Sequence, residues 1–327
     1  YAAILFALVN SAGRIADGSM TIAQALIVLM LSYSYFSAAK ELLNASHSAL
    51  TAIAAAGKVE EILDTDTSRP YDPALPADPK QFEGIRMDHV SYGYEGRSRA
   101  LQDISLTVPK GKTVAMVGLS GCGKSTTASL LMRFCDPLSG NIYIEGKDYC
   151  SMKPEELRKH IAMVPQQVNL FSGTIRENLL LADPGAKDAA LLEALEEAGL
   201  GAFIRSQSKG LDSDVGNAGS SLSGGQRQKM GIARALLSKA EYMIFDEATS
   251  SVDPQSEKEI WETIGHLAES RTLIIISHRM SSVQNADCIY VLRDGRVAQH
   301  GTHEALMAEG GLYKELVVRQ QAMEVAE

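Results

Sequence analysis

A nine-residue glycine-rich segment, Gly118-Leu-Ser-Gly-Cys-Gly-Lys-Ser-Thr126, constrains what this chain can fold into more than any other feature. The apolar run Thr113–Val117 before it predicts a buried strand, and the residues from Thr126 onward predict a helix. Glycines between a strand and a helix let backbone N–H groups approach an anion that side chains would block. Lys124 then reaches the outer phosphates of a nucleotide, and the Ser125 hydroxyl is placed to bind Mg²⁺. The order of strand, loop and helix favours a nucleotide phosphate site over a glycine turn that matches by coincidence.

The segment Glu241–Glu247 predicts a short hydrophobic strand that ends in two adjacent acids. A carboxylate at the end of a buried strand can hold Mg²⁺, directly or through water, opposite Ser125; we expect this role for Asp246. Glu247 would point the other way on a pleated strand and be free to polarise an attacking water. An apolar run before Asp-Glu is also a common strand end, so this interpretation depends on the phosphate loop.

Between these segments lies the turn Leu222-Ser-Gly-Gly-Gln226, followed by apolar residues that suit a helix packed on one side. Taken alone, it is a helix N-terminus able to bind a second anion, or an ordinary glycine-rich helix start. With the phosphate loop before it, and Asp-Glu and an isolated His278 after it, the chain resembles ATP-binding cassette (ABC) transporters over residues 13–320. The resemblance implies an α/β P-loop NTPase cassette with a mixed core sheet, an antiparallel β subdomain and a helical lobe at about residues 152–238.

The resemblance also assigns roles to single residues. Tyr94 is similar to the family's aromatic residue that stacks on adenine, although a strand-edge tyrosine has the same pattern. Gln166 resembles the glutamine that contacts Mg²⁺ and water and links the site to the membrane domain. Asp253 resembles the acid that crosses the interface between two cassettes, and His278 the histidine at the γ-phosphate. A lone histidine after a strand is more often structural, so the role of His278 depends on the resemblance.

The expected site residues form three sets. Glu247, His278 and Gln166 are expected to be catalytic, and Ser125, Gln166 and Asp246 to bind Mg²⁺. The resemblance implies that two cassettes face each other head to tail, so that the turn of one covers ATP held by the loop of the other. The residues expected to contact ATP are Tyr94, Gly118, Ser120, Gly121, Cys122, Gly123, Lys124, Ser125, Thr126, Ser223, Gly224, Gly225, Gln226 and Asp253.

Two positions carry further expectations. Cys122 lies in the phosphate loop near a helix N-terminus, where a thiolate is favoured, so its alkylation should block ATP binding. Exporters of this family often carry Val-Gly-Glu shortly before the turn that corresponds to Leu222–Gln226, here called the signature turn. This chain has Val215-Gly-Asn217 instead. A carboxylate that would touch the membrane domain is thus a neutral amide, which bears on coupling to transport and not on ATP chemistry.

The composition of the chain changes before residue 60. From Met20 to Ala39 it carries no charge over about the 20 residues that a spanning helix needs, and Gln24 could face other helices or a substrate path. A buried soluble helix is the alternative, and no basic start or cleavage pattern supports a secretory signal. With the resemblance, residues 1–63 are expected to end a membrane domain: a partial helix at 1–12, a polar turn at Gly13–Gly18, a spanning helix at 20–39 and its continuation to 63.

Residues 64–80 hold four of the chain's ten prolines, which prevents a helix and predicts an extended interdomain linker. The cassette is then expected at 81–327. Its first strands, Ile85–Tyr94 and Leu101–Val108, alternate apolar and polar residues as an antiparallel sheet does. An Asp-Gly turn predicts a hairpin within Val291–Val297.

These features predict an ATPase that uses ATP and Mg²⁺ to drive export of a drug, lipid, peptide or other small molecule. The alternatives are a soluble cassette ATPase acting on DNA or ribosomes, an importer cassette, and a subunit of a heterodimeric transporter with an importer or regulatory role. The apolar segment disfavours the soluble and importer classes, and intact Glu247 and His278 disfavour a purely regulatory module. A net charge of −9 and the absence of a basic stripe speak against nucleic acid, and four cysteines without metal-ligand spacing fit a reducing cytosol.

The expected partner is a second ABC half-transporter. Twofold symmetry makes a homodimer the default, and Asn217 leaves a heterodimer open. The resemblance implies a multi-pass protein of the plasma (inner) membrane with its cassette in the cytoplasm.

Overall fold

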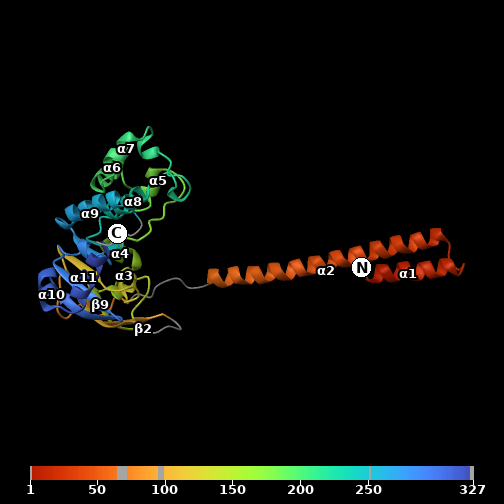
Figure 1. Ribbon diagram of the computed structural model, residues 1–327, viewed down its shortest axis with the longest axis horizontal. Helices are drawn as coiled ribbons and strands as arrows, with labels where there is room; N and C mark the ends of the chain where they lie inside the picture. The colour runs from red at the N-terminus through yellow and green to blue at the C-terminus, as the bar shows by residue number, and fades with distance from the viewer. Residues whose placement is uncertain (1, 65–71, 95–98, 250–251, 325–327) are drawn as a thin grey trace. The chain divides into compact units, whose positions relative to one another are not determined.

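The computed structural model describes residues 2–64, 72–94, 99–249 and 252–324 of the 327-residue chain. The chain divides into two compact units, Tyr1–Ser68 and Arg69–Glu327, and each is described by itself (Figure 1).

The first unit is a pair of helices, α1 (Ala2–Ala16) and α2 (Ile22–Asp64), packed against each other. Gly13 lies inside α1, so the turn begins only at Asp17, later than the polar residues predicted. The N-terminus of α2 is capped because Thr21 N donates to Gln24 Oε1 (2.9 Å) and Gln24 N to Thr21 Oγ1 (3.4 Å). The Gln24 side chain therefore satisfies backbone groups of its own helix.

By length and composition, α2 is the one helix in the described part of the chain that could cross a membrane; its most apolar window has a mean hydropathy of 1.6. Its 43 residues span roughly 64 Å at about 1.5 Å per residue, about twice the roughly 30 Å hydrocarbon core of a bilayer. Only part of α2 can therefore lie in a bilayer, and the charged residues from Lys40 onward mark the part that cannot.

The second unit contains two sheets. The smaller is antiparallel with strand order β2-β1-β4-β5, and its register pairs Ile85 with both Val108 and Ile144. Apolar residues of β1 and β2 alternate onto its buried face, as predicted from their sequence. The four strands are β1 (Gly84–Gly93), β2 (Arg99–Pro109), β4 (Ser139–Ile144) and β5 (Lys147–Asp148).

The larger sheet has strand order β10-β9-β3-β8-β7-β6 and is parallel except for β10. Every residue of β3, β7 and β8 is buried, because this sheet is covered on both faces. The strands β3, β8, β7 and β6 lie side by side and run in one direction, so the loops after them meet at one edge. The strands are β3 (Thr113–Val117), β6 (Ile161–Val164), β7 (Tyr242–Asp246), β8 (Thr272–Ile276), β9 (Cys288–Arg293) and β10 (Arg296–Gly301).

Two apolar clusters fill the unit. Val114 and Met116 face a cluster shared with the antiparallel sheet and α3, whereas Ala115 and Val117 face one shared with the helices on the opposite side. The β9–β10 hairpin turns at Asp294 (φ 51°) and Gly295 (φ 75°), the pair of left-handed residues that a type I′ turn requires.

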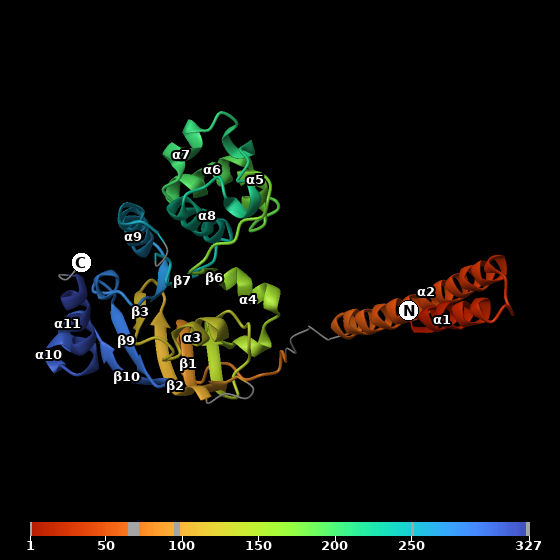
Figure 2. The same cartoon turned by 45° about the vertical axis from the view of Figure 1, so that its right-hand side comes forward.

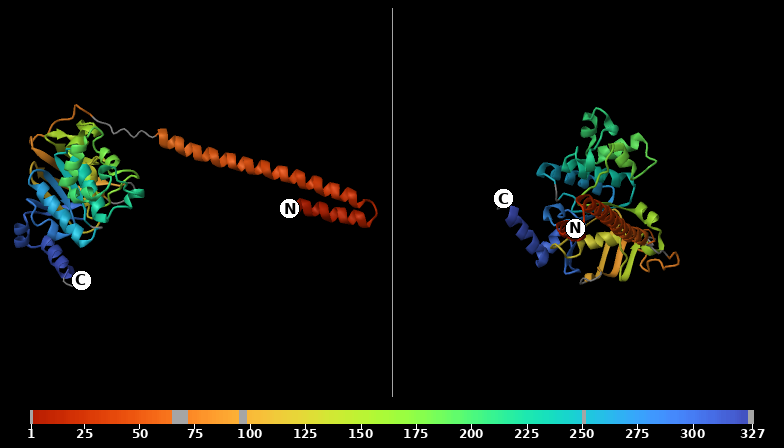
Figure 3. Two further views of the ribbon diagram at one scale, coloured as in Figure 1. Left: turned by 90° about the horizontal axis from the view of Figure 1, so that it is seen from above. Right: turned by 90° about the vertical axis from the view of Figure 1, so that its right-hand side faces the viewer.

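The helices α5 to α8 gather into one region, and the strands β1 and β2 lie at the opposite end of the unit (Figures 2 and 3). The α-helices of the unit are α3 (Lys124–Leu131), α4 (Pro154–His160), α5 (Ile175–Leu180), α6 (Asp188–Glu197), α7 (Gly201–Ser206), α8 (Gly224–Leu237), α9 (Pro254–Ala268), α10 (His303–Glu309) and α11 (Leu312–Glu324). Short 3₁₀ turns are η1 (Tyr149–Ser151), η2 (Gly210–Asp212), η3 (Asn217–Gly219) and η4 (Met280–Ser282).

Asp78 belongs to the folded cassette, although the sequence placed it in an extended linker. Its side chain is buried, forms an ion pair with Arg86, and accepts from Lys80 N (2.8 Å) and Phe82 N (3.2 Å). The Arg86 guanidinium holds the pKa of Asp78 below its usual value. This buried pair moves the start of the cassette ahead of residue 81, and residues 65–71 of the expected linker lie outside the described residues.

Candidate nucleotide site

The phosphate loop connects the carboxyl end of β3 to α3, which begins at Lys124, two residues earlier than predicted. Glycine is required where the loop approaches its neighbours. A Cβ on Gly118 (φ 151°) would lie 2.3 Å from Leu292 O, and one on Gly123 (φ 110°) would lie 2.4 Å from Leu101 Cδ2. The loop therefore lies so close to β2 and to the β9–β10 hairpin that only backbone fits at Gly118 and Gly123.

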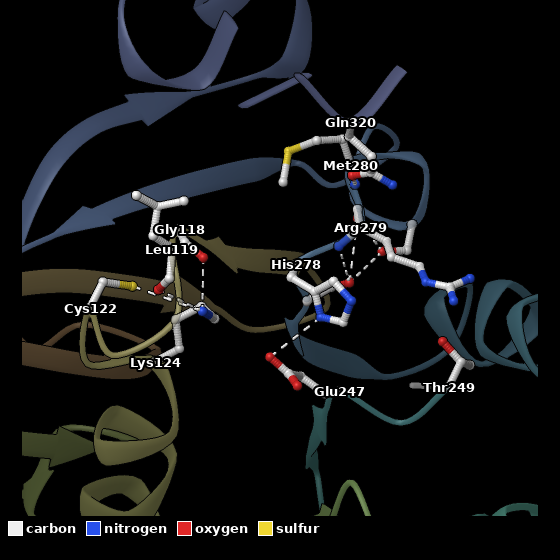
Figure 4. A network of polar contacts seen from close by, with 12 residues as sticks. Gly118, Leu119, Cys122, Lys124, Glu247, Thr249, His278, Arg279, Met280 and Gln320 are labelled. Carbon is white, nitrogen blue, oxygen red and sulfur yellow. Dashed lines mark hydrogen bonds and ion pairs between the residues drawn. The ribbon is translucent and has the colours of Figure 1, made fainter. Parts of the chain in front are cut away.

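The Lys124 ammonium lies over the loop itself. Its Nζ donates to Gly118 O (2.9 Å) and Leu119 O (3.2 Å) and is 3.9 Å from Cys122 Sγ (Figure 4). The side chain is buried, so a positive charge is held at the inner side of a glycine-rich turn. Charge and backbone donors together make this turn fit for a phosphate anion.

Cys122 differs from its sequence prediction. Burial raises the pKa of its thiol, and the opposing effect of Lys124 does not cancel this shift. The expectation of a favoured thiolate is wrong, because removal from water outweighs the nearby cation and the hydrogen bonds to the sulfur. Its Sγ contacts the lysine as a neutral thiol.

Asp246 ends β7 next to Ser125. Burial raises the pKa of Asp246 and Glu247 adds to the shift, whereas a hydrogen bond with Ser125 and the charge of Lys124 act against it. Its Oδ1 atom is buried without a hydrogen-bond partner in the part of the chain that the structure describes. A buried carboxylate oxygen beside a hydroxyl fits a hard dication such as Mg²⁺.

Other ligands of such an ion would have to come mainly from water and nucleotide, as Mg²⁺ commonly requires. Within the described residues no group of three or more His, Cys, Asp or Glu side chains could hold a metal. Gln166 follows β6 at the same edge of the sheet, where it lines a groove of about 320 Å³ together with Gly224 and Val252.

Glu247 and His278 come together from neighbouring strands. His278 Nδ1 lies 3.5 Å from Glu247 Oε1 (Figure 4), and both side chains are open to solvent in part. Glu247 has a left-handed backbone (φ 47°), and its N–H donates to Ile276 O (2.9 Å). The predicted alternation along a strand does not orient Glu247, because the chain has already left the pleat. A non-glycine residue held in this conformation is a feature of active sites.

Tyr94 lies at the entrance to α3. Its hydroxyl is 3.4 Å from Thr126 Oγ1, and its ring meets that of Tyr92 edge-on with centroids 5.1 Å apart. The side chain remains about half exposed, at 45%. An aromatic surface is therefore available beside the phosphate loop.

The signature turn is a helix cap. Ser223 Oγ accepts from Gln226 N (3.1 Å), and Gln226 Oε1 accepts from Ser223 N (2.9 Å), which together form a capping box at α8. Gly225 lets α8 approach α9, since a Cβ there would lie 2.5 Å from Ser256. Asp253 caps α9 by accepting from Ser256 N (3.0 Å). The two helix N-termini are thus built side by side.

Asn217 also has a local partner, because its Oδ1 accepts from Ser172 Oγ (3.2 Å). A further group escaped the sequence analysis: Glu257 on α9 binds both Thr249 and Arg279. In the sequence, only the positions of its partners could have indicated this group: Thr249 follows Glu247 by two residues, and Arg279 is adjacent to His278.

Comparison with known proteins places this site in a family. A family model described as ABC transporter matches residues 101–250. The chain is 39% identical over 317 residues to an ATP-dependent lipid A-core flippase of Chromobacterium violaceum, covering 96% of this chain and 54% of that protein. It is 43% identical over 247 residues to a sophorolipid transporter of Starmerella bombicola, covering 74% and 19%.

Among solved structures, a bacterial Atm1-family ABC exporter with ATP bound matches with a TM-score of 0.74 and 33% identity, over 97% of this chain and 55% of that one. The chain therefore spans about half, or less, of the length of the proteins it matches. The predicted α/β P-loop cassette with a long apolar helix before it is confirmed. With a phosphate loop, a signature turn and paired acids at one sheet edge, the chain belongs to the ABC transporter family and carries its ATP-binding cassette.

Proposed function

We propose that this chain is the C-terminal part of an exporter-type half-transporter, in which ATP binding and hydrolysis drive a small molecule, lipid or peptide across a membrane. The observation that carries the proposal is the convergence of Lys124, Asp246, Glu247 and His278 at one edge of the parallel sheet. Charge to bind phosphates, a carboxylate for a metal and a base for water are thereby combined in one site.

ATP would lie with its phosphates on the backbone of Gly118–Thr126 and its adenine against Tyr94. Lys124 would exchange its contacts with two loop carbonyls for contacts with the outer phosphates, since an anion is the stronger partner for an ammonium group. Ser125, Asp246 and Gln166 would hold Mg²⁺ in the family manner. Bound there, Mg²⁺ neutralises charge on the β- and γ-phosphates.

Glu247 would act as the general base. Its carboxylate orients a water and accepts its proton while the water oxygen attacks the γ-phosphorus and the bond to the leaving ADP oxygen breaks. His278, held 3.5 Å from Glu247, would donate to the γ-phosphate. Lys124 would stabilise the same charge from the opposite side.

A second half-transporter would supply the other part of each site. Ser223 to Gln226 form a preformed helix cap, and Asp253 caps the adjoining helix, so one surface offers both to a partner. A homodimer is the simplest arrangement by symmetry. The apolar part of α2 would span the plasma (inner) membrane of a multi-pass protein, with the cassette in the cytoplasm.

Size-exclusion chromatography of the full chain in detergent, carrying Glu247→Gln, tests the proposal. A dimer that forms only with Mg-ATP supports paired cassettes. A monomer that still binds ATP contradicts self-pairing and favours a heteromeric partner. Failure to bind ATP contradicts the assignment of the phosphate loop. The full chain is used because Asp78 belongs to the folded cassette and a chain begun at residue 81 would lack it.

A further inference from the structure

One carboxylate joins three segments that converge on the site. Glu257, in the first turn of α9, accepts from Thr249 Oγ1 at Oε1 (3.1 Å) and from the Arg279 guanidinium at Oε2. Thr249 lies two residues after Glu247, and Arg279 is the neighbour of His278. We propose that Glu257 is a positioning residue, which sets where Glu247 and His278 stand relative to each other. This inference rests on the proposed function.

The contact with Thr249 fixes the segment that follows Glu247. Residues 250 and 251 lie outside the described residues, and beyond them Asp253 caps α9, which begins at Pro254. Glu257 binds across this interval, from the first turn of the helix back to Thr249, whose side chain is buried. Thr249, two residues after Glu247, is thereby joined to the first turn of α9.

The contact with Arg279 fixes the segment that carries His278. The Arg279 backbone is held on both sides: its N–H donates to Ser277 Oγ (2.9 Å), and its carbonyl accepts from Ser282 Oγ (2.6 Å). Met280 N donates to Gln320 Oε1 on α11 (2.7 Å). His278 therefore stands between anchored neighbours, and Glu257 ties this anchored turn to α9.

Substitution of Glu257 or Arg279 should change the positions of the catalytic segments more than it changes the packing of the core. Glu257 is 14% exposed and Arg279 38% exposed, and both line a cavity of about 480 Å³ between α9 and β8 together with Lys258 and Trp261. Because this space already lies beside the pair, Glu257→Gln opens no new void in the core. The isosteric amide keeps the size of the side chain and removes the charge that holds Arg279.

The expected consequence is a loss of turnover without a loss of ATP affinity. A displacement of about 1 Å of a catalytic group can cost roughly 10²-fold in rate. Glu257 touches neither the phosphate loop nor Tyr94 in any of its hydrogen bonds described above, so binding of ATP should persist. We expect Glu257→Gln to lower kcat at least 10-fold at unchanged KM. Arg279→Ala should lower kcat as well, and Arg279→Lys should lower it less.

A matched control lies on the same helix. Glu259 binds Lys229 Nζ (2.7 Å), so Glu259→Gln also removes an ion pair of α9, but one that leads to α8 and not to the catalytic segments. The full chain in detergent is compared as wild type, Glu257→Gln, Glu259→Gln and Glu247→Gln. Phosphate release, ATP binding and melting temperature are measured for each.

Two readouts separate positioning from general destabilisation. In a His278→Ala background, Glu257→Gln should cost less in kcat than it costs in the wild type, because one of the two groups that it positions is gone. In histidine-selective NMR spectra, Glu257→Gln should move the His278 ring resonances, which His278→Ala identifies, and Glu259→Gln should leave them in place.

The positioning role is overturned if Glu257→Gln and Glu259→Gln behave alike in kcat, or if the His278 resonances do not move. It is likewise overturned if the loss in the His278→Ala background is undiminished. The proposed function fails separately, if the wild-type chain binds no ATP or if its hydrolysis is unaffected by Glu247→Gln. The NMR readout needs no turnover, so it decides the positioning role even then.

Discussion

His278 Nδ1 lies 3.5 Å from Glu247 Oε1, although 30 residues separate the two along the chain. They meet because β7 and β8 are neighbours in a parallel sheet, which brings their carboxyl ends to one edge. The proposed base and the proposed γ-phosphate donor are thus brought together by the order of the strands.

Glu247→Gln should lower ATP turnover by about 10²–10⁴-fold and leave ATP binding intact, because the amide cannot accept the proton of water. Phosphate release and nucleotide binding measure the two effects. Glu241→Gln, just before the other end of β7, removes an exposed pair with Lys110 and should change neither. Wild-type turnover in Glu247→Gln would show that another group is the base.

Cys122 should resist alkylation at neutral pH, since burial raises the pKa of its thiol and hides its sulfur. A thiol with a raised pKa stays protonated up to a higher pH. Labelling should therefore increase as pH rises toward and past the ordinary thiol pKa of 9.0. Mass spectrometry of the phosphate-loop peptide measures this, with Cys122→Ser as the blank. Rapid labelling at pH 7 would show instead that Cys122 is a thiolate at neutral pH.

Asp78→Ala should destabilise the cassette by about 1–3 kcal/mol, because it removes the buried partner of Arg86 and leaves this buried cation paired only with the partly exposed Asp88. Urea unfolding can be followed by the fluorescence of Trp261, the chain's one tryptophan. The same substitution on exposed Asp103, which pairs with His89, should cost little.

The Asp78 contribution should also depend on pH. Its pKa is lowered in the folded state, so the stabilisation is fully present above the unfolded value near 3.8 and is lost as pH falls through the folded value. The difference between wild type and Asp78→Asn should therefore be constant from neutral pH down to about pH 5 and shrink below pH 4. A difference that instead shrinks on raising the pH would contradict the ion pair.

Asp246→Asn should raise the melting temperature in the absence of Mg²⁺ while abolishing Mg²⁺-dependent hydrolysis. Burial raises the pKa of Asp246 and the neighbouring Glu247 adds to the shift, so a neutral amide removes a buried charge that the folded state disfavours. Asp287→Asn is the opposite control. Although burial acts the other way, Thr113 N and Lys112 lower the pKa of Asp287, so its loss should reduce the melting temperature.

Much of the cassette could be predicted because its signals are local. The phosphate loop, the acids after β7 and the Asp-Gly hairpin each occupy a few consecutive residues whose chemistry dictates the backbone. The role of Glu257 could not be predicted in this way, since its partners lie 8 and 22 residues away and meet it only through the packing of α9.

Two of the errors have their origin in burial. A proline-rich segment predicts an extended chain, and nothing local indicates that Asp78 will be enclosed with Arg86. A helix N-terminus favours a thiolate, but at Cys122 burial outweighs the charge of Lys124 and the local hydrogen bonds, so the pKa of the thiol is raised. The error at Glu247 has a different origin. The prediction assumed that Glu247 continues the pleat of the strand, whereas its left-handed backbone shows that the strand has already ended.

The contacts of Lys124 with Gly118 and Leu119 set a threshold for occupancy of the phosphate loop. An anion gains the ammonium group only by displacing two carbonyl oxygens that already satisfy it. A chloride ion would gain few contacts beyond the ammonium group, whereas ATP would also engage the loop amides and Ser125 through its phosphates and Tyr94 through its adenine. The loop should thereby stay unresponsive to the small anions of its surroundings and close only on a ligand long enough to occupy all of its positions.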